Sequence, residues 1–342
     1  MHGDIRVARL NGTEEIGLEQ TPISEPESKE VQIKVQYCGI CGTDLHAYLG
    51  KHPFINPPVI PGHEFVGKIE TIGDEVMNES LSPGDFVTME PSITCGVCSQ
   101  CRSGKYHICQ ELKVFGCQMD GALAEYVNVP AEKVVKIPPE LGIEGVMVEP
   151  AAVGVHAVGK TPIVNSKVLV VGAGPIGLLT AQAANFFGAN TVAVSDLRQD
   201  RLNMAQQLGI DSQILVEENN SEGTGQSKTG DAFDLVFECS GTRGGINSAI
   251  DQVKKGGQIV LIGVFEGRVH AQLNLVQDRE LNLTGSIMYR RPDFLLASEL
   301  IYQGKIEAKP LLTDQFPLEK TEEAFQKLIG ARSEALKGVI TL

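Results

Sequence analysis

The sequence predicts an α/β protein that combines an antiparallel β domain with a doubly wound parallel sheet, and three observations lead to this prediction. The chain has 342 residues, which is too long for one ordinary hydrophobic core, so two domains are expected. Between Val31 and Pro138, Gly and Pro separate short alternating runs, as in antiparallel sheets. After Glu149, compact apolar runs alternate with helical patterns, which is typical of a parallel sheet.

The individual elements follow from these patterns. The first half is predicted to form strands over VQIKVQYCGI, EFVGKIETIG, DFVTMEP, ALAEYVNVP and KVVKIP. The second half is predicted to form strands over KVLVVGAG, TVAVSD, FDLVFECSG and QIVLIGV, with helices over GLLTAQAANFFGA and DRLNMAQQLGI. The polar run from Glu217 to Gly230 is predicted to be a solvated loop. Beyond Leu283, a helix over TEEAFQKLIG and a strand over KGVITL could extend the parallel sheet or return to the first domain.

Composition narrows the class of protein. The chain carries 29 basic and 43 acidic residues, a net charge of −14, and it lacks the Lys/Arg runs of a nucleic-acid binder. Neither a secretory leader pattern nor a run of 18 apolar residues occurs, so we expect a cytoplasmic protein with no membrane partner. Its eight cysteines are expected to be metal ligands or buried thiols, because the cytosol keeps thiols reduced.

A glycine-rich turn predicts a dinucleotide site. The apolar run 168–171 leads directly into Gly172, Gly174 and Gly177 and then into a helical pattern, the context that this fingerprint requires. The glycines allow a tight turn, the approach of a pyrophosphate and close helix packing, and the helix N-terminus favours phosphate. Pro175, Ile176 and Arg201 complete the expected cofactor contacts. The alternative is a turn whose glycines serve packing only.

The carboxylate at the end of the next strand predicts which cofactor binds. Asp196 lies where an acidic residue accepts hydrogen bonds from the adenosine ribose. Since its charge would repel a 2′-phosphate, NAD is favoured over NADP. Arg198, two residues further on, weakens this preference slightly.

Four cysteines in one short segment predict a structural zinc site. Cys95, Cys98, Cys101 and Cys109 supply four thiolates from a single loop, and Zn²⁺ prefers four such ligands in a tetrahedron. A closed tetrathiolate leaves no position for a substrate, so the site is structural. Unligated cysteines or disulfides are the alternatives.

The stretch CGICGTDLH raises the question of whether Cys38 and Cys41 form a redox-active pair. Such pairs normally begin a helix, whereas Cys38 follows a predicted strand. Downstream, PGHEF supplies His63 and Glu64, and VEPAAVGVHA supplies Glu149. Cysteine, histidine and carboxylate from separate segments could converge on one metal with an open position, which is the ligand logic of catalytic zinc. The alternative for His63 is a hydrogen-bonded core histidine.

In these motifs, their order and their spacing, the chain resembles the zinc-dependent medium-chain alcohol and polyol dehydrogenases over essentially its whole length. The resemblance implies a GroES-like antiparallel β catalytic domain, residues 1–148 and 289–342, with a structural zinc lobe at about residues 90–110. It also implies a Rossmann NAD-binding domain over residues 149–288, two zinc ions per chain and a homotetramer. The tail from about Tyr289 is therefore expected to return to the catalytic domain.

The resemblance assigns roles to the residues of the proposed catalytic zinc site. Cys41 matches a zinc ligand, and Cys38 matches no functional position. Where the family's alcohol dehydrogenases have a cysteine as the third protein ligand, the sorbitol-like branch carries Glu in an EP motif, and this chain has Glu149 there and Glu64 after His63. Cys41 and His63 are therefore expected to bind zinc with one or both of Glu64 and Glu149, which exchange with water during turnover. A carboxylate donates less charge than a thiolate, which should leave a stronger Lewis acid.

Further residues match supporting positions of the family. Asp44 matches the carboxylate that orients the histidine ligand, while Thr43 and His46 match a proton relay to solvent. The residues that match the substrate pocket of the sorbitol-like branch are Tyr48, Phe115 and Tyr289, and Arg290, which follows Tyr289, is a further pocket candidate. An aromatic residue at such a position is as readily part of the core, and Met288 stands where the branch has Arg.

The predicted function is therefore NAD-dependent oxidation of a secondary alcohol of a polyol or sugar derivative to a ketose or ketone, with a small molecule as the only partner besides other copies of the chain. L-Threonine 3-dehydrogenase and 2,3-butanediol dehydrogenase are the enzymatic alternatives. The absence of Trp disfavours the threonine enzymes, which carry a Trp-containing segment, and the four-cysteine lobe disfavours the butanediol enzymes, many of which have other insertions there. A non-catalytic NAD-binding protein is the alternative from another class.

Overall fold

The computed structural model describes residues 3–78, 80–217, 233–330 and 335–342, and these residues fall into two compact units. The first unit comprises Met1–Glu149, Arg290–Tyr302 and Ala308–Leu342, and the second comprises Pro150–Tyr289 and Gln303–Glu307. From residue 218 onward, the run expected to be a solvated loop lies outside the described residues.

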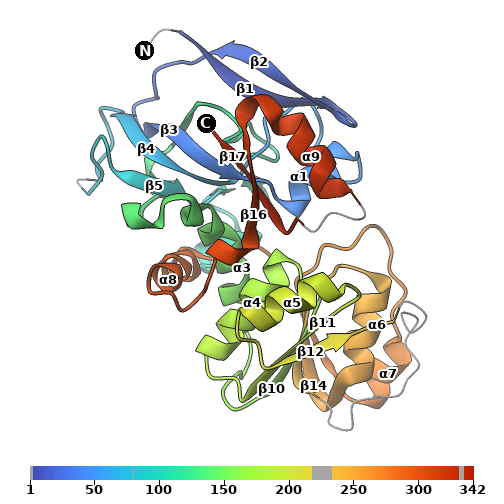
Figure 1. Cartoon of the computed structure of the whole chain (residues 1–342). Helices are drawn as coiled ribbons and strands as arrows, with labels where there is room; N and C mark the ends of the chain where they lie inside the picture. Colours follow the sequence, from blue (N-terminus) through green and yellow to red (C-terminus); the bar gives the residue numbers. More distant parts are fainter. Residues whose placement is uncertain (1–2, 79, 218–232, 331–334) are drawn as a thin grey trace. The chain divides into compact units, whose positions relative to one another are not determined.

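The first unit consists mainly of strands with short helices between them (Figure 1). Its strands are β1 Asp4–Gly12, β2 Glu15–Pro22, β3 Glu30–Gly39, β4 Glu64–Ile72, β5 Phe86–Met89, β6 Ser92–Ile93, β7 Lys113–Val114, β8 Tyr126–Pro130, β9 Val134–Lys136, β16 Leu312–Pro317 and β17 Lys337–Thr341. Its α-helices are α1 Gly42–Tyr48, α2 Ser99–Arg102, α8 Arg291–Tyr302 and α9 Thr321–Ile329.

The main sheet of this unit joins the two ends of its sequence. It has seven strands, in the order β16-β17-β3-β4-β5-β9, and β8 also pairs with β3. Strand β17 runs antiparallel to β3, with Val339 opposite Gly39. The last segments of the chain, whose placement periodicity left open, therefore belong to the sheet of β3.

A glycine permits the closest approach within this sheet. Gly67 lies in β4, and a Cβ atom there would lie 2.2 Å from the backbone oxygen of Lys34 in β3. Because no heavy atoms approach so closely without a bond, only glycine allows these two strands to pair in this register.

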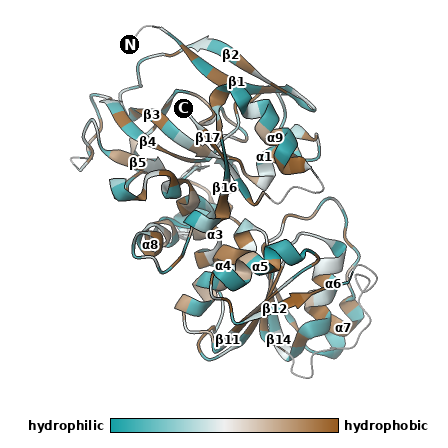
Figure 2. Ribbon diagram, in the orientation of Figure 1, coloured by the Kyte–Doolittle hydropathy of each residue, from teal (hydrophilic) through white to brown (hydrophobic). Residues whose placement is uncertain are grey.

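The hairpin of β1 and β2 was not predicted from the sequence. It forms a separate two-stranded antiparallel sheet, and Figure 2 shows teal and brown residues mixed along both strands. Ile5, Val7, Leu10 and Ile16 are buried in the core of the first unit. One face of the hairpin is thus apolar, which explains why so short a sheet is stable here.

The second unit is a parallel sheet with helices. Its strands are β10 Lys167–Val171, β11 Thr191–Asp196, β12 Ser212–Leu215, β13 Phe233–Glu238, β14 Val253–Leu261 and β15 Asn282–Gly285. Its helices are α4 Pro175–Phe186, α5 Gln199–Gln207, α6 Arg243–Gln252 and α7 Leu273–Asp278, while α3 Val148–Val158 begins two residues before the unit. The sheet order β12-β11-β10-β13-β14-β15 reverses direction between β10 and β13, as in doubly wound folds. The predicted α/β fold class is confirmed.

One stretch, Pro139–Val158, is long and apolar enough to cross a membrane by length and composition alone. It has 20 residues and a mean hydropathy of 1.3, but 78% of the apolar window is buried inside the protein. Core helices of soluble proteins share these properties, so the stretch is weak evidence for a membrane span.

Candidate metal and cofactor sites

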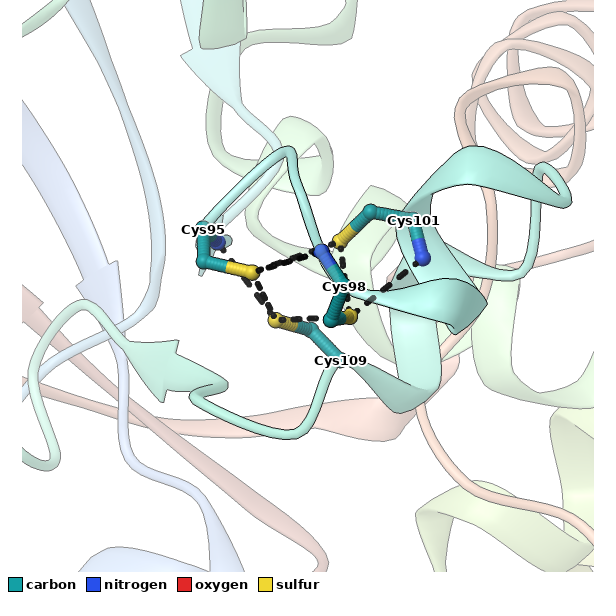
Figure 3. A group of neighbouring side chains, drawn as sticks. All are labelled: Cys95, Cys98, Cys101 and Cys109. Carbon is teal, nitrogen blue, oxygen red and sulfur yellow. Dashed lines mark hydrogen bonds between the residues drawn. The ribbon is translucent and has the colours of Figure 1, made fainter.

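The four cysteines of the predicted structural lobe converge on one point (Figure 3). The Sγ atoms of Cys98 and Cys101 are 3.5 Å apart, as are those of Cys95 and Cys109. The separations are 3.9 Å between Cys98 and Cys109 and 4.0 Å between Cys95 and Cys101. A tetrahedron with Zn–S bonds of about 2.3 Å has edges of about 3.8 Å. The spacing of the four sulfurs therefore fits a zinc ion.

The protonation of these thiols also suits a cation. Hydrogen bonds from the backbone N–H groups of Gln110 and Cys101 lower the pKa of Cys98 to about 6, and the N–H of Cys95 similarly lowers that of Cys109. Burial and hydrogen bonds from neighbouring thiols raise the pKa of Cys101 to about 12. The cluster thus shares its protons among close sulfurs, and metal binding would release them.

A second group of potential metal ligands lies at the ends of β3 and β4. The ligand atoms of Cys41, His63 and Glu64 all lie within 4.8 Å of one another. Cys41 follows β3, whereas His63 immediately precedes β4 and Glu64 begins it. Since Gly39 pairs with Glu64 across the two strands, the strand pairing itself brings the three side chains together.

Asp44 links helix α1 to this group. Its Oδ2 accepts a hydrogen bond from the N–H of Cys41 (2.8 Å), which caps the helix. Its Oδ1 is buried, has no hydrogen-bond partner and lies 3.7 Å from Nδ1 of His63. Cys117 Sγ lies 3.8 Å from the same nitrogen. Asp44 is thus placed to orient His63, although its oxygen is beyond hydrogen-bonding distance in this structure.

Lys337 is a residue of this site that the sequence analysis missed. Its Nζ lies 2.6 Å from Oε1 of Glu64, also contacts Oε2, and donates to the backbone oxygen of Ile40. The side chains of Lys337 and Glu64 are 4% and 1% exposed, respectively, so this is a buried ion pair. No sequence signal could have identified it, because the two residues are 273 positions apart.

The charges around His63 favour a cation. Burial alone would lower the pKa of His63, but Asp44, Cys117 and Cys41 outweigh it and raise the pKa well above the ordinary value. Burial raises the pKa of Asp44. An electrostatic field that stabilises a protonated histidine also stabilises a metal cation. The site therefore fits the expected zinc ion in three respects: this field, the unpaired oxygen of Asp44 and the three converging donor atoms.

Three other predicted residues lie near this group but outside it. Glu149 is buried in the first turn of α3, and its carboxylate is among the charges that raise the pKa of Lys337, yet it does not join the cluster of Cys41, His63 and Glu64 among the described residues. Thr43 and His46 are half-buried on α1. Because they are three residues apart, they lie on one face of the helix.

The predicted substrate residues lie in different environments. Tyr48 and Phe115 belong to the hydrophobic core of the first unit, where Tyr48 packs against Phe325 with ring centroids 5.4 Å apart. Tyr289 is fully buried. Arg290 is exposed, and its backbone N–H donates to Asp293 Oδ2 (2.9 Å). The assignment of these residues to a substrate pocket stays a prediction.

The glycine-rich turn has the geometry that a dinucleotide requires. Gly172 adopts a φ of 100°, which favours glycine. A Cβ atom on Gly177 would lie 1.9 Å from the backbone oxygen of Gly172, and one on Gly174 would lie 3.3 Å from Nη1 of Arg201. Pro175 and Ile176 open helix α4. The N-cap of α4, Gly174, has no side chain to cap the helix, so the N-terminus of α4 can present backbone N–H groups to a phosphate.

A cavity of about 330 Å³ adjoins this turn. Its lining includes Gly172, Ser195, Asp196, Leu197, Thr242 and Ser248. Asp196 Oδ2 accepts a hydrogen bond from the N–H of Ala173 (2.7 Å), and its Oδ1 accepts one from the N–H of Arg198 (2.9 Å). The acidic residue thus faces a cavity large enough for a nucleoside.

Replacing Asp44 by asparagine is expected to weaken zinc binding at the Cys41, His63 and Glu64 group by about 10–100-fold. Asparagine retains an oxygen for the N–H of Cys41, so the helix cap survives while the negative charge beside His63 is lost. Competition with a chromophoric chelator would measure the affinity. Asp74→Asn, at an exposed position, provides the control, and equal affinities for all three proteins would contradict the role of Asp44.

Comparison with known proteins finds matches along nearly the whole chain. Residues 27–139 match the model of the alcohol dehydrogenase GroES-like domain, and residues 175–303 match that of the zinc-binding dehydrogenase domain. Sorbitol dehydrogenase of Bacillus subtilis (strain 168) is 31% identical over 98% of this chain and 97% of its own. L-Threonine 3-dehydrogenase of Pyrococcus furiosus is 35% identical over 96% of each chain.

One similar solved structure contains a bound cofactor. A protein from Sinorhizobium meliloti 1021, whose crystal structure contains NADP, superposes with a TM-score of 0.90 over 99% of this chain and 100% of its own, at 30% identity. The likeness covers both units of the chain. It is therefore not confined to a single shared domain.

Proposed function

The chain belongs to the zinc-dependent medium-chain dehydrogenase family, and from this premise we propose that it oxidises a secondary alcohol of a polyol or sugar derivative to a ketone or ketose with NAD. The observation that carries this proposal is the convergence of one cysteine, one histidine and one carboxylate, Cys41, His63 and Glu64. The family resemblance gives the Glu of the EP motif, here Glu149, as the feature that separates the sorbitol-like branch from the cysteine-rich alcohol dehydrogenases, and this residue is buried in the first turn of α3. The sequence similarity to a sorbitol dehydrogenase supports the same substrate class.

The proposed metal content is two zinc ions per chain. The first is held by Cys95, Cys98, Cys101 and Cys109, and it stabilises the lobe. The second would be held by Cys41, His63 and Glu64, and Glu149 is a further carboxylate that could bind it during turnover. When bound, this zinc ion supplies a Lewis acid that lowers the pKa of an alcohol hydroxyl. Asp44 orients His63, and Lys337 balances the charge of Glu64.

Thr43 and His46 are proposed to carry the released proton to solvent. Both are half-buried on one face of α1, directly after Cys41. A threonine hydroxyl can accept and donate a proton at once, and a histidine can exchange protons with water near neutral pH. The first turn of α1 thus combines a metal ligand with the start of the relay.

The proposed cofactor is NAD, which accepts the hydride when bound. Asp196 at the end of β11 supports this choice because its carboxylate would repel a 2′-phosphate. The related structure with NADP makes a direct comparison of the two cofactors necessary. We also propose a cytoplasmic homotetramer, as the family resemblance suggests.

L-Threonine or a vicinal diol is the second candidate substrate. The 35% identity to a threonine dehydrogenase over 96% of this chain favours it as much as sequence similarity can. The same zinc and cofactor residues would serve either substrate, so only activity measurements separate the two.

The test is a substrate panel with the purified zinc-loaded protein. Reduction of NAD and of NADP is measured with sorbitol, xylitol, L-iditol, galactitol, aldonic acids, L-threonine and 2,3-butanediol. The highest kcat/KM is expected for a polyol or sugar acid with NAD. A preference for threonine or butanediol would refute the polyol assignment, and NAD binding without any turnover would favour a non-catalytic protein.

Cys41→Ser tests whether the proposed metal site performs the reaction. We expect about one zinc per chain instead of about two, and a loss of kcat of roughly a thousandfold or more, because a Lewis acid contributes several kcal/mol. Cys38→Ala is the matched control, since Cys38 is buried three residues earlier and lies outside the ligand cluster. Unchanged kcat in Cys41→Ser would overturn the assignment.

A further inference from the structure

The end of strand β11 carries two residues of opposite charge that would favour different cofactors. Asp196 is the last residue of β11 and lines the cavity beside the glycine-rich turn. Arg198 precedes helix α5 by one residue, and its backbone N–H donates to Asp196 Oδ1 (2.9 Å). A carboxylate here reads the 2′-hydroxyl of NAD, whereas an arginine here can accommodate the 2′-phosphate of NADP.

A second carboxylate holds the arginine side chain. Arg198 Nε donates to Asp200 Oδ1 (3.0 Å), and Nη2 donates to Asp200 Oδ2 (2.5 Å). The two parallel bonds form a bidentate pair, the geometry in which a guanidinium binds a carboxylate or a phosphate most strongly. The charged edge of Arg198 that a phosphate would need is therefore occupied by Asp200.

The surroundings indicate that the ion pair of Arg198 and Asp200 can be broken, whereas the neighbouring charged residues are held by other contacts. Arg198 and Asp200 are 31% and 37% exposed, so the pair is partly solvated and can be broken at modest cost. Arg201 differs, because it is half-buried and its Nη1 lies beside Gly174, at the turn that approaches the pyrophosphate. Asp196 is committed to two backbone N–H groups. Of the charged groups at this strand end, Arg198 is thus the one that a 2′-phosphate could recruit.

We propose that Asp200 is a specificity-determining residue, which selects NAD by holding Arg198 in a bidentate pair away from the 2′-phosphate position. This inference rests on the proposed NAD preference and deepens it. Asp196, at the end of β11, then repels the 2′-phosphate of NADP. Asp200, in α5, keeps Arg198 from attracting that phosphate.

The test measures binding of cofactor fragments, which needs neither substrate nor turnover. Calorimetry would give the Kd of ADP and of 2′,5′-ADP for the zinc-loaded wild type and for Asp200→Asn, Arg198→Met and the double variant. Asp200→Asn is expected to tighten 2′,5′-ADP binding about fivefold to tenfold, with ADP binding changed less than about twofold. The double variant should lose the gain, since the gain acts through Arg198.

Three outcomes of the binding measurements would overturn the inference. No gain in Asp200→Asn would show that the pair does not restrain Arg198 from the phosphate. A gain that persists in the double variant would assign the effect to the general loss of negative charge. Tighter binding of 2′,5′-ADP than of ADP by the wild type would overturn both this inference and the NAD preference. Failure of every alcohol in the substrate panel would refute the proposed reaction alone, because the binding cycle is independent of it.

Discussion

Replacing Lys337 by methionine is expected to lower the free energy of unfolding of the metal-free protein by about 3–5 kcal/mol. Methionine fills a similar volume but leaves the carboxylate of Glu64 without its positive partner, at 1% exposure. A buried charge without compensation is far more costly than a buried pair. Urea denaturation followed by far-UV circular dichroism, after dialysis against a chelator, would measure the loss.

Two comparisons make this result specific to the buried pair. Adding Glu64→Gln to Lys337→Met should restore most of the stability, because neither charge then remains. Lys320→Met is the matched control. Lys320 pairs with Glu323 on the surface, with both side chains more than half exposed, and a change of no more than about 1 kcal/mol is expected. Equal stabilities of Lys337→Met and wild type would contradict the importance of the pair.

The same variant reports whether Glu64 binds zinc. If it does, the ion supplies the positive charge that the lysine supplied, so the destabilisation measured in the zinc-loaded protein should be clearly smaller than in the metal-free protein. An identical loss with and without zinc would show that Glu64 remains dependent on Lys337, and Glu149 would then become the better candidate for the third ligand.

The second large effect is expected for Cys101→Ser, which should remove one zinc ion per chain and unfold the lobe over residues 95–109. Structural zinc contributes on the order of 10 kcal/mol to the folding of small zinc-dependent units, and three remaining thiolates cannot close a tetrahedral site. Metal analysis should give about one zinc per chain, and limited proteolysis should cleave within the lobe. Cys239→Ser, in the second unit, is the control and should retain two zinc ions.

Unfolding of the lobe should also destabilise the first turn of helix α8. The hydroxyl of Tyr106, within the lobe, accepts a hydrogen bond from the N–H of Arg291 at the start of α8 (2.6 Å). The Arg291 side chain donates to the backbone oxygens of Glu132 and Val134. Hydrogen exchange at the first turn of α8 is therefore expected to accelerate in Cys101→Ser. Unchanged exchange there, with the lobe cleaved, would show that the helix is held by its other contacts alone.

The sequence predicts those parts of the fold whose signals are local. The runs KVLVVGAG and TVAVSD form β10 and β11, because short β-branched stretches bounded by glycine or aspartate have few alternatives. Helix α1 was not predicted, since its glycine and threonine are poor helix formers. The helix instead depends on the hydrogen bond from Cys41 to Asp44. The preference for Ser or Thr in such caps hides a cysteine cap from sequence patterns.

In the candidate site, too, the sequence predicts only the residues that carry a local signal. Cys41, His63 and Glu64 could be selected from sequence because each lies in a distinctive motif, and strand pairing then brings them together. Lys337 carries no motif, and only the tertiary fold reveals its contact with Glu64. Tyr48 has the residue type of a pocket residue, but its packing against Phe325 depends on where α9 lies. Contacts between distant segments are thus the part that local patterns cannot give.

The pairing of β17 with β3 has a consequence for the order of events during translation. Val339 lies opposite Gly39, so about 300 residues are added between the two partners, which takes roughly 15–60 s at typical elongation rates. Throughout this interval the end of β3 lacks its neighbouring strand, while the strands of the second unit, residues 167–285, emerge as one continuous stretch. Of these two units, the one whose first strands emerge earlier is therefore completed later. Its open strand edge is the point at which a nascent chain most needs protection from pairing with a neighbour.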